Sequence, residues 1–381
     1  MDDFDDLPED LDDVEVIYSD GEEDEEPIED DFHEDIPISS DDLAGEVIDL
    51  SQLTFNGHGN SVFSSDVSKD QTLAVTGGED DMAYLWNTST GEVVFECTGH
   101  KDSVTEVCFN HNDQYIATGD MAGMIQVWSV QEKKLVWCFE GDEIGWLLWH
   151  PMSNILFAGC QTGDIYIWQI PSGNCKILPS PANVSCTCGK ILPNGKQLLA
   201  GYENGQIRLW DIKETNAIWT NVTDNDSVNG LDLNQDGSLV ITAPKANVLK
   251  MSDGKAIGNV LIEGESEIEA AIFNNDLNVI ITGSLSGQLG VWQLGKFVLR
   301  HQARIEASVT VLKLGTFNRV FVGATDGGVY VCDAKAGTLL DVLTGHKRCI
   351  LSVTVFSDGN RVLTTSDDGT AKIFGLKQYS M

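Results

Sequence analysis

The sequence has few basic residues and no long apolar run. Its 381 residues include 23 Lys and Arg against 60 Asp and Glu, a formal net charge of −37. A surface this acidic repels phosphate, so we expect no direct nucleic-acid binding and no attraction to anionic lipid. No stretch approaches the ~18 consecutive apolar residues of a membrane-spanning helix, so we expect no membrane insertion. The first residues, Met1 to Asp6, lack the basic and apolar regions of a signal peptide, which predicts a protein that is not secreted.

The motifs of common catalytic and metal sites are also missing. There are nine cysteines but no Cys-x-x-Cys pair, which argues against a zinc or thioredoxin-like site and favours reduced thiols. We therefore expect a cytoplasmic protein, with the nucleus as a second compartment. The sequence contains no phosphate-binding loop and no His-Glu-x-x-His motif, and the run Gly283-Ser284-Leu285-Ser286-Gly287 has Leu where a nucleophile would stand. The sequence thus predicts no enzyme, no cofactor and no metal.

Basic residues are missing altogether from the first part of the chain. The first 46 positions contain 23 Asp and Glu and no Lys or Arg. A segment with so few apolar side chains cannot bury enough surface to offset the entropy of ordering it, so residues 1–45 are predicted to be a disordered acidic tail. Two interpretations of this tail stay open: a solubilising, self-repelling segment, or one that shields a basic partner.

The remainder of the sequence repeats with a period of about 41 residues. Alternating runs end in a large side chain at positions separated by 40 to 42 residues. Each copy contains four short alternating segments with Asn, Asp or Gly turns between them, as in 104–109, 115–119 and 124–128, which predicts four strands. One such unit cannot bury both of its faces, so the copies must stack. The eight anchor positions are Trp86, Trp128, Trp168, Trp210, Met251, Trp292, Cys332 and Phe374.

Too few residues follow the last anchor to form a complete eighth unit. The segment 46–55 before the first unit has the alternation of a strand. We therefore predict that this segment completes the last blade and closes the ring, which removes an exposed sheet edge. The predicted domain covers residues 46–378, with eight blades of four antiparallel strands; seven blades would require one anchor outside the ring.

The ends of the repeats carry a recognisable pair of motifs. Units open with Gly57-His58, Gly99-His100 and Gly345-His346, and one closes with Trp210-Asp211. In these motifs the chain resembles the WD-repeat β-propeller family, an all-β fold. The resemblance implies a structural network in which an Asp six residues before the Trp joins a His, a Ser or Thr, and the Trp. The matching residues are His58, Asp80 and Trp86 in the first unit and His346, Asp368 and Phe374 in the last. Other units depart from the pattern at Ala122, Thr162, Asn204, Lys245 and Ser286.

In such a propeller, the loops before each first strand and the hairpins before each third strand gather on one face. Acidic residues dominate these positions, and we predict that they form a partner-binding face with two aromatic residues among them, which would suit Arg and Lys side chains. For Trp146 the alternative is packing within a blade. The predicted face comprises Glu79, Asp81, Asp102, Glu106, Asp120, Asp142, Glu143, Trp146, Tyr202, Glu203, Glu267, Glu269, Asp326 and Asp367, with Asp226 and Glu265 in the same loops.

The acidic leader followed by eight units, together with the run from Gly78 to Trp86, resembles one branch of the family. Its fungal member is a dedicated chaperone that captures the basic N-terminal segment of a newly made large-subunit ribosomal protein. The resemblance implies a monomeric ribosome-assembly chaperone with a basic protein as partner. The alternative is a scaffold in cell-migration signalling or in a ubiquitin pathway.

Overall fold

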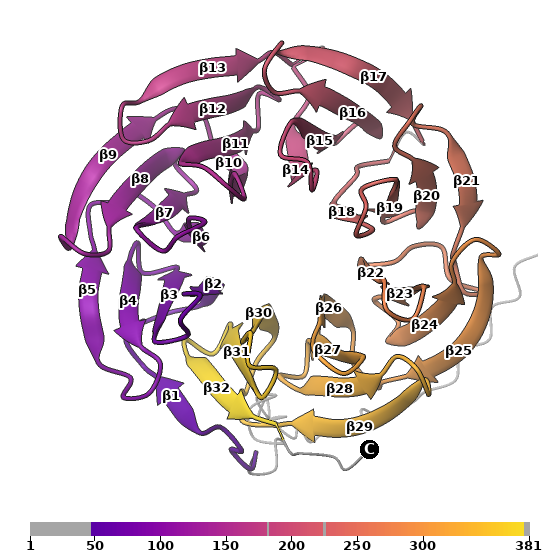
Figure 1. Ribbon diagram of the computed structural model, residues 1–381. Coiled ribbons are helices and arrows are strands. Elements are labelled where there is room, and N and C mark those ends of the chain that lie inside the picture. The colour runs from indigo at the N-terminus through magenta and orange to yellow at the C-terminus, as the bar shows by residue number, and fades with distance from the viewer. Residues whose placement is uncertain (1–46, 181–182, 224–225, 377–381) are drawn as a thin grey trace, which may run out of the picture. The chain divides into compact units, whose positions relative to one another are not determined.

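The computed structural model describes residues 47–180, 183–223 and 226–376. Residues 1–45, for which we predict a disordered tail, lie outside the described residues, as does the predicted domain end at residue 378. The described residues form 32 strands in eight four-stranded antiparallel sheets. The sheets stand around a central channel as the blades of a propeller, with the first strand of each blade innermost (Figure 1). The predicted all-β fold of eight blades is confirmed.

The first four blades follow one another along the chain. Blade 1 comprises β2 (Val62–Val67), β3 (Leu73–Gly78), β4 (Ala83–Asn87) and β5 (Val93–Cys97). Blade 2 comprises β6 (Val104–Phe109), β7 (Tyr115–Asp120), β8 (Met124–Ser129) and β9 (Lys134–Glu140). Blade 3 comprises β10 (Ile144–Trp149), β11 (Ile155–Cys160), β12 (Ile165–Gln169) and β13 (Asn174–Leu178). Blade 4 comprises β14 (Cys186–Ile191), β15 (Gln197–Tyr202), β16 (Gln206–Asp211) and β17 (Asn216–Val222).

The other four blades complete the ring. Blade 5 comprises β18 (Gly230–Leu233), β19 (Leu239–Ala243), β20 (Asn247–Lys250) and β21 (Ala256–Asn259). Blade 6 comprises β22 (Ala270–Asn274), β23 (Val279–Gly283), β24 (Gln288–Gln293) and β25 (Val298–Arg304). Blade 7 comprises β26 (Val309–Leu314), β27 (Arg319–Ala324), β28 (Val329–Asp333) and β29 (Thr338–Leu343). Blade 8 comprises β30 (Ile350–Val355), β31 (Arg361–Ser366), β32 (Ala371–Gly375) and the early strand β1 (Leu53–Phe55).

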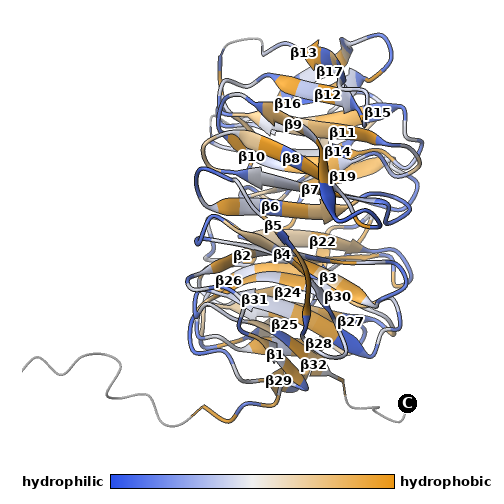
Figure 2. Cartoon of the chain, turned by 90° about the vertical axis from the view of Figure 1, so that its left-hand side faces the viewer, coloured by the Kyte–Doolittle hydropathy of each residue, from blue (hydrophilic) through white to orange (hydrophobic). Residues whose placement is uncertain are grey.

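Apolar side chains are packed between neighbouring blades, because each sheet has two faces to cover. The second strands are the most deeply buried, as in β7, where the last five residues are all buried. The cluster that joins blade 8 to blade 1 shows the arrangement: Phe55 of β1 stacks on Trp86 of β4 with ring centroids 4.7 Å apart. A view from the side shows hydrophobic strands through the body and hydrophilic loops at both edges (Figure 2). The core is therefore divided over the interfaces between blades.

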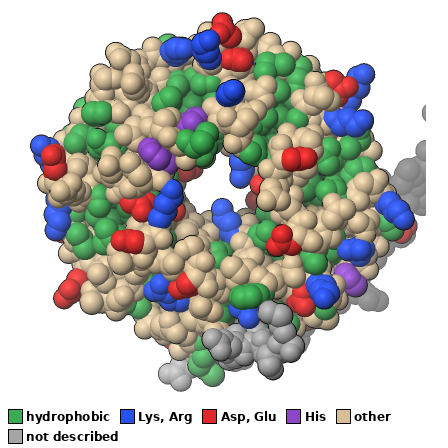
Figure 3. Space-filling model, in the orientation of Figure 1, with side chains coloured by type: hydrophobic (Ala, Val, Ile, Leu, Met, Phe, Trp, Pro, Cys, Tyr) green, Lys and Arg blue, Asp and Glu red, His purple; other side chains and the backbone are tan. Residues whose placement is uncertain are grey.

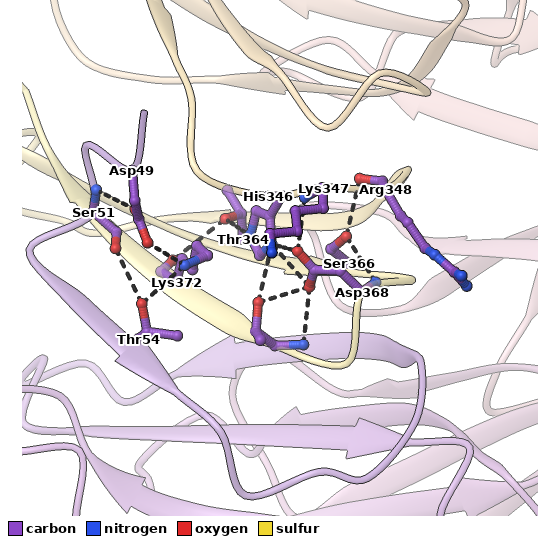
Figure 4. A network of polar contacts seen from close by, with 11 residues as sticks. Asp49, Ser51, Thr54, His346, Lys347, Arg348, Thr364, Ser366, Asp368 and Lys372 are labelled. Carbon is purple, nitrogen blue, oxygen red and sulfur yellow. Dashed lines mark hydrogen bonds and ion pairs between the residues drawn. The ribbon is translucent and has the colours of Figure 1, made fainter. Parts of the chain in front are cut away.

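The ring is closed by β1, which pairs with β32 as the fourth strand of blade 8. The register places Leu53 opposite Ile373 and Phe55 opposite Ala371. The ammonium of Lys372, whose side chain is 6% exposed, lies 2.6 Å from Asp49 Oδ2 and donates to Thr54 Oγ1 at 3.0 Å. Figure 4 shows Asp49 and Thr54 pointing toward Lys372. The predicted closure by the segment before the first unit is confirmed.

The structure corrects the anchor of blade 5. The residue that pairs as Trp86 does is Leu249, which lies opposite Val240, whereas Met251 follows the strand. Met251 corresponds to Thr88 of blade 1 instead. Met251 N donates to Ser238 O at 2.9 Å, as Thr88 N does to Thr72 O. The hairpin between β19 and β20 is shorter than in blade 1, so the anchor comes earlier than the regular spacing predicts.

The loops form two faces of the ring. We call the upper face the one made by the connections between successive blades, such as 98–103, and by the hairpins between second and third strands, such as 121–123. The lower face is made by the connections between first and second strands and between third and fourth strands. Within the described ranges, no helix is long and apolar enough to span a membrane.

Candidate partner-binding face

In each of three blades, a buried His near the upper face belongs to a chain of hydrogen-bonded side chains. In blade 1 the Trp86 indole N–H donates to Thr76 Oγ1 at 3.3 Å, and Thr76 lies 2.9 Å from His58 Nε2. His58 Nδ1 in turn donates to Asp80 Oδ1 at 2.9 Å. Because the imidazole is buried and both of its nitrogens are occupied, this His braces the hairpin against the blade and is unavailable for catalysis.

Blade 8 repeats this arrangement with Phe374 in the Trp position. His346 lies 2.8 Å from Thr364 Oγ1 and 3.0 Å from Asp368 Oδ2. Burial raises the pKa of Asp368, but the hydrogen bonds from His346 and from the backbone N–H of Lys347 outweigh it and hold the pKa well below its usual range. Figure 4 shows His346 between the hydroxyl of Thr364 and the carboxylate of Asp368.

Blade 2 contains a third such chain, which changes the role predicted for Asp120. Its carboxylate is fully buried and lies 3.0 Å from His100 Nδ1, and His100 Nε2 lies 2.7 Å from Thr118 Oγ1. Asp120 is therefore a structural residue and does not belong to a partner-binding surface. Asp120 does not fit the family pattern, because it comes eight residues before Trp128 and the pattern has six. Gly99-His100 in the same unit was the available signal.

The two aromatic residues predicted for the face are also buried. Trp146 is 6% exposed, and its indole N–H donates to Cys186 Sγ at 3.4 Å, across the boundary between blades 3 and 4. A Cβ at Gly159 or Gly189 would clash with this indole, so both glycines make room for it. Tyr202 is fully buried, and burial raises the pKa of its hydroxyl. Neither side chain can form an aromatic wall for a peptide, and for Trp146 the packing interpretation is the correct one.

Most of the other predicted acids do lie in upper-face loops. Asp367 is partly exposed, and the others are exposed, namely Glu79, Asp81, Asp102, Asp142, Glu143, Glu203, Glu267, Glu269 and Asp326. Three further acids of these loops were not predicted: Asp164, Glu263 and Glu306. Glu263 stands in the same connection as the predicted Glu267 and Glu269, whereas Asp164 and Glu306 stand in upper-face loops for which no acid was predicted.

Basic side chains neutralise only part of this surface. Lys245 lies 2.9 Å from Asp226 and 3.0 Å from Glu267, and Arg348 lies 3.6 Å from Asp367. In the part of the chain that the structure describes, the remaining predicted acids of the loops form no ion pair with Lys or Arg: Glu79, Asp81, Asp102, Asp142, Glu143, Glu203, Glu269 and Asp326. Such carboxylates keep their charge available for a partner.

The two faces differ strongly in charge. The described upper-face loops contain 17 acidic and 4 basic residues, a net charge of −13, whereas the lower-face loops contain 9 acidic and 7 basic residues, a net charge of −2. Figure 3 views the ring from the lower face, where acidic and basic side chains are interspersed. Among the described loops, charge of one sign is therefore concentrated on the upper face.

Glu106 lies elsewhere than predicted, on the innermost strand β6 and in the central channel. Lys313 of β26 is close enough to interact electrostatically with both Glu106 and Asp66 of β2. Lys190 pairs with Asp232 at 3.5 Å on another part of the wall. Burial raises the pKa of Asp66 to about 6 and that of Glu106 to about 7. The channel thus holds carboxyls that take up protons near neutral pH.

Across the described ranges, no three His, Cys, Asp or Glu side chains are arranged to hold a metal ion. The nine cysteines are free thiols, and burial raises the pKa of several of them, including Cys97 and Cys108. Thiols with raised pKa values are poor nucleophiles, because the thiolate is the reactive form.

Comparison with known proteins agrees with this architecture. Residues 50–87, 91–129, 174–211 and 337–375 match the model of the WD domain, G-beta repeat. Angio-associated migratory cell protein of Homo sapiens is 38% identical over 354 residues, covering 87% of this chain and 81% of the relative. Ribosome assembly protein SQT1 of Saccharomyces cerevisiae is 24% identical over 402 residues, covering 91% and 92% of the two chains.

Two solved structures have the same fold. The crystal structure of Saccharomyces cerevisiae Sqt1 superimposes with a TM-score of 0.80 at 21% identity, covering 87% of this chain and 100% of the other. The structure of Chaetomium thermophilum Sqt1 bound to the N-terminus of the ribosomal protein L10 superimposes with a TM-score of 0.77 at 20% identity, covering 86% and 100%.

Proposed function

Because the chain belongs to the WD-repeat family of angio-associated migratory cell protein, we propose that it is a non-enzymatic binding protein and a ribosome-assembly chaperone. Its client is the basic N-terminal segment of a newly made large-subunit ribosomal protein, which binds to the upper face. The structure of a propeller of this fold in complex with the N-terminus of ribosomal protein L10 supports this choice of client.

The observation that carries the proposal is the charge difference between the faces. The upper-face loops have a net charge of −13 and the lower-face loops one of −2. Ribosomal proteins are basic because they bind RNA, and before assembly their basic segments need an anionic surface in place of RNA. The upper face offers exposed carboxylates that no basic side chain of the described residues neutralises, Glu143 and Glu203 among them.

Charge also determines how a client would arrive. A field of one sign raises the association rate of an oppositely charged peptide by about 10–10³ at low salt. Each exposed ion pair then contributes roughly 0.2–1 kcal/mol, so several pairs are needed for stable capture. The acids stand on short loops between paired strands, so the propeller itself has little conformational entropy to lose when the peptide binds. Release on the ribosome follows when RNA competes for the same basic side chains.

The test is a charge reversal on each face. The upper-face variant carries Asp102→Lys, Asp142→Lys, Glu143→Lys and Glu203→Lys. The control carries Glu92→Lys, Glu132→Lys, Glu214→Lys and Asp276→Lys on the lower face and changes the net charge equally. A synthetic peptide of the first ~20 residues of ribosomal protein L10 is titrated against each by fluorescence anisotropy at low and physiological salt. We expect the upper-face variant to bind ~100-fold more weakly than wild type and the control to bind within about threefold.

Two results would contradict the proposal. Equal losses in both variants would mean that the peptide senses only net charge, and unchanged binding by the upper-face variant would mean that this face is not the site. A scrambled peptide of the same composition distinguishes the functions. If it binds as tightly as the native sequence, the protein is no dedicated chaperone, and a scaffold in signalling or in a ubiquitin pathway becomes the better interpretation.

A further inference from the structure

A basic groove with an apolar floor lies on the lower face between blades 3 and 4. It has a volume of about 780 Å³, within the range of sites that hold ligands or peptide side chains. Its floor is formed by Ile155, Ile167 and Ile212, and its rim carries Lys176 and two further lysines, Lys196 and Lys213. Near the top of the view, over these two blades, Figure 3 shows a hydrophobic area with basic and some acidic side chains at its border.

The rim lysines have few acidic partners. Lys176 Nζ donates to the backbone carbonyl of Lys213 at 3.1 Å, across the boundary between the blades. Lys213 lies 3.5 Å from the neighbouring Glu214, but both side chains are largely exposed, so this pair contributes little. Over the described residues, neither Lys176 nor Lys196 forms an ion pair. The rim is therefore positive in a chain with a net charge of −37.

The one carboxylate that lines the groove is already occupied. Asp211 Oδ1 accepts the backbone N–H groups of Lys213 at 2.9 Å and of Glu214 at 2.8 Å. It therefore holds the turn after β16 in shape, and it competes weakly for the ammonium groups. An incoming carboxylate would meet lysines that the protein has not neutralised.

We propose that this groove docks an acidic peptide segment of a partner protein, with large apolar side chains between its Asp or Glu residues. The apolar side chains fill the floor at Ile155, Ile167 and Ile212, and the carboxylates pair with the three lysines. A nucleic acid fits less well, because single-stranded bases bind by stacking on aromatic side chains and the lining residues include none. The Debye length of about 8 Å at physiological salt screens such a peptide from the distant acids of the upper face.

This groove does not depend on the proposed chaperone function. It lies on the face opposite the proposed client site, so a basic client and an acidic partner can be bound together. The chain would then act as an adaptor between two proteins of opposite charge.

The full chain provides the test. A fluorescein-labelled 12-residue peptide of alternating Glu and Leu is titrated at physiological salt, and we expect saturable binding with a Kd below ~1 mM. The variant Lys176→Glu, Lys196→Glu, Lys213→Glu should bind at least ~10-fold more weakly, because it reverses the rim charge. The matched control Lys134→Glu, Lys296→Glu, Lys335→Glu changes lysines outside the groove and should bind as wild type does. Peptides with Gln for Glu, or with Ser for Leu, should each lose at least ~10-fold in affinity, since charge and apolar contact are both required.

Several outcomes would overturn the proposal. These are no saturable binding, equal binding by the groove variant and wild type, or tighter binding of a 12-nucleotide single-stranded RNA than of the peptide. Melting temperatures establish that both variants fold. If the triple variant does not fold, the single variant Lys196→Gln takes its place; a loss of less than about twofold in that variant would count against the groove.

Discussion

The upper and lower faces of this propeller are built from loops of the same kind and carry different charge. Both consist of short turns between antiparallel strands, yet the described upper-face loops have a net charge of −13 and the lower-face loops one of −2. Backbone geometry cannot account for this, because the blades repeat one topology eight times. The difference lies in side chains that the fold does not require. It teaches that in a propeller the strands determine the architecture and the loops of each face determine what binds there.

Acidic residues near the upper face are themselves of two kinds. Asp80, Asp120 and Asp368 accept hydrogen bonds from buried histidines and belong to the blades. Asp142 and Glu203 are exposed and form no ion pair with any described basic residue. Removal of the first kind should affect folding and removal of the second kind should affect binding, and this difference can be measured.

Opening the ring should destroy both faces together and gives the largest expected effect. Deletion of residues 1–56 removes β1 and leaves the edge of β32 unpaired. An unpaired sheet edge can pair with other chains, so this variant should be prone to aggregation. We expect the melting temperature to fall by at least about 10 °C, or the protein to aggregate. Deletion of residues 1–42 keeps the Asp49–Lys372 ion pair and the β1–β32 pairing, so the melting temperature should hardly change. Similar melting curves for the two deletions would contradict closure by β1.

A second experiment separates the two kinds of acid. Asp120→Ala leaves a buried His100 without its partner, which should lower the free energy of unfolding by about 2–4 kcal/mol. Asp142→Ala on the surface should change it by less than ~0.5 kcal/mol. Urea unfolding followed by tryptophan fluorescence measures both. If the two substitutions prove equally mild, the His100 chain does not brace the blade as the contacts indicate.

The smallest expected effect concerns pH and the channel. Burial raises the pKa of Glu106 to about 7, above its ordinary value of 4.5. The folded state therefore holds this proton more tightly than the unfolded state does, and stability is lost as the pH rises from about 4.5 through 7. Glu106→Gln cannot ionise, so it should be more stable than wild type at pH 8, by about 1–3 kcal/mol, and differ little at pH 4.5.

The control for this experiment is Glu203→Gln, an exposed acid of the upper face. Because this side chain is exposed, Glu203→Gln should change stability at pH 8 much less than Glu106→Gln does. Thermal melts over that range check both variants. If the difference in stability between Glu106→Gln and wild type stays constant over this pH range, burial in the channel does not disfavour the charged form of Glu106.

Much of this fold could be predicted from the sequence, because its repeat is regular. Anchors such as Trp86 and Trp292 recur at nearly constant spacing, and the known connectivity of a propeller then assigns each loop to a face. The prediction failed where one unit departs from the period. In blade 5 the short hairpin moves the anchor to Leu249. Leu249 and Met251 are both large and apolar, so the sequence alone does not show which of them is the anchor.

The candidate sites were harder to predict, because burial depends on the neighbouring blade. Trp146 stands where the repeat is expected to have a small or polar residue, but Gly159 and Gly189 leave room for its side chain between two sheets. Asp120 reaches its His from an unexpected position in the hairpin. The basic groove could not be predicted from the sequence, since Lys176, Lys196 and Lys213 come from three separate segments and meet only when blades 3 and 4 pack together.

The pairing of β1 with β32 also sets a waiting time during synthesis. Leu53 and its partner Ile373 are separated by more than 300 residues. At translation rates of about 5–20 residues per second, β1 therefore exists for roughly 15–60 s before its partner strand is made. During that time blade 8 is incomplete, and β1 has no partner strand and is available to other chains. A protein proposed here to protect newly made polypeptides thus passes through an unprotected stage of its own.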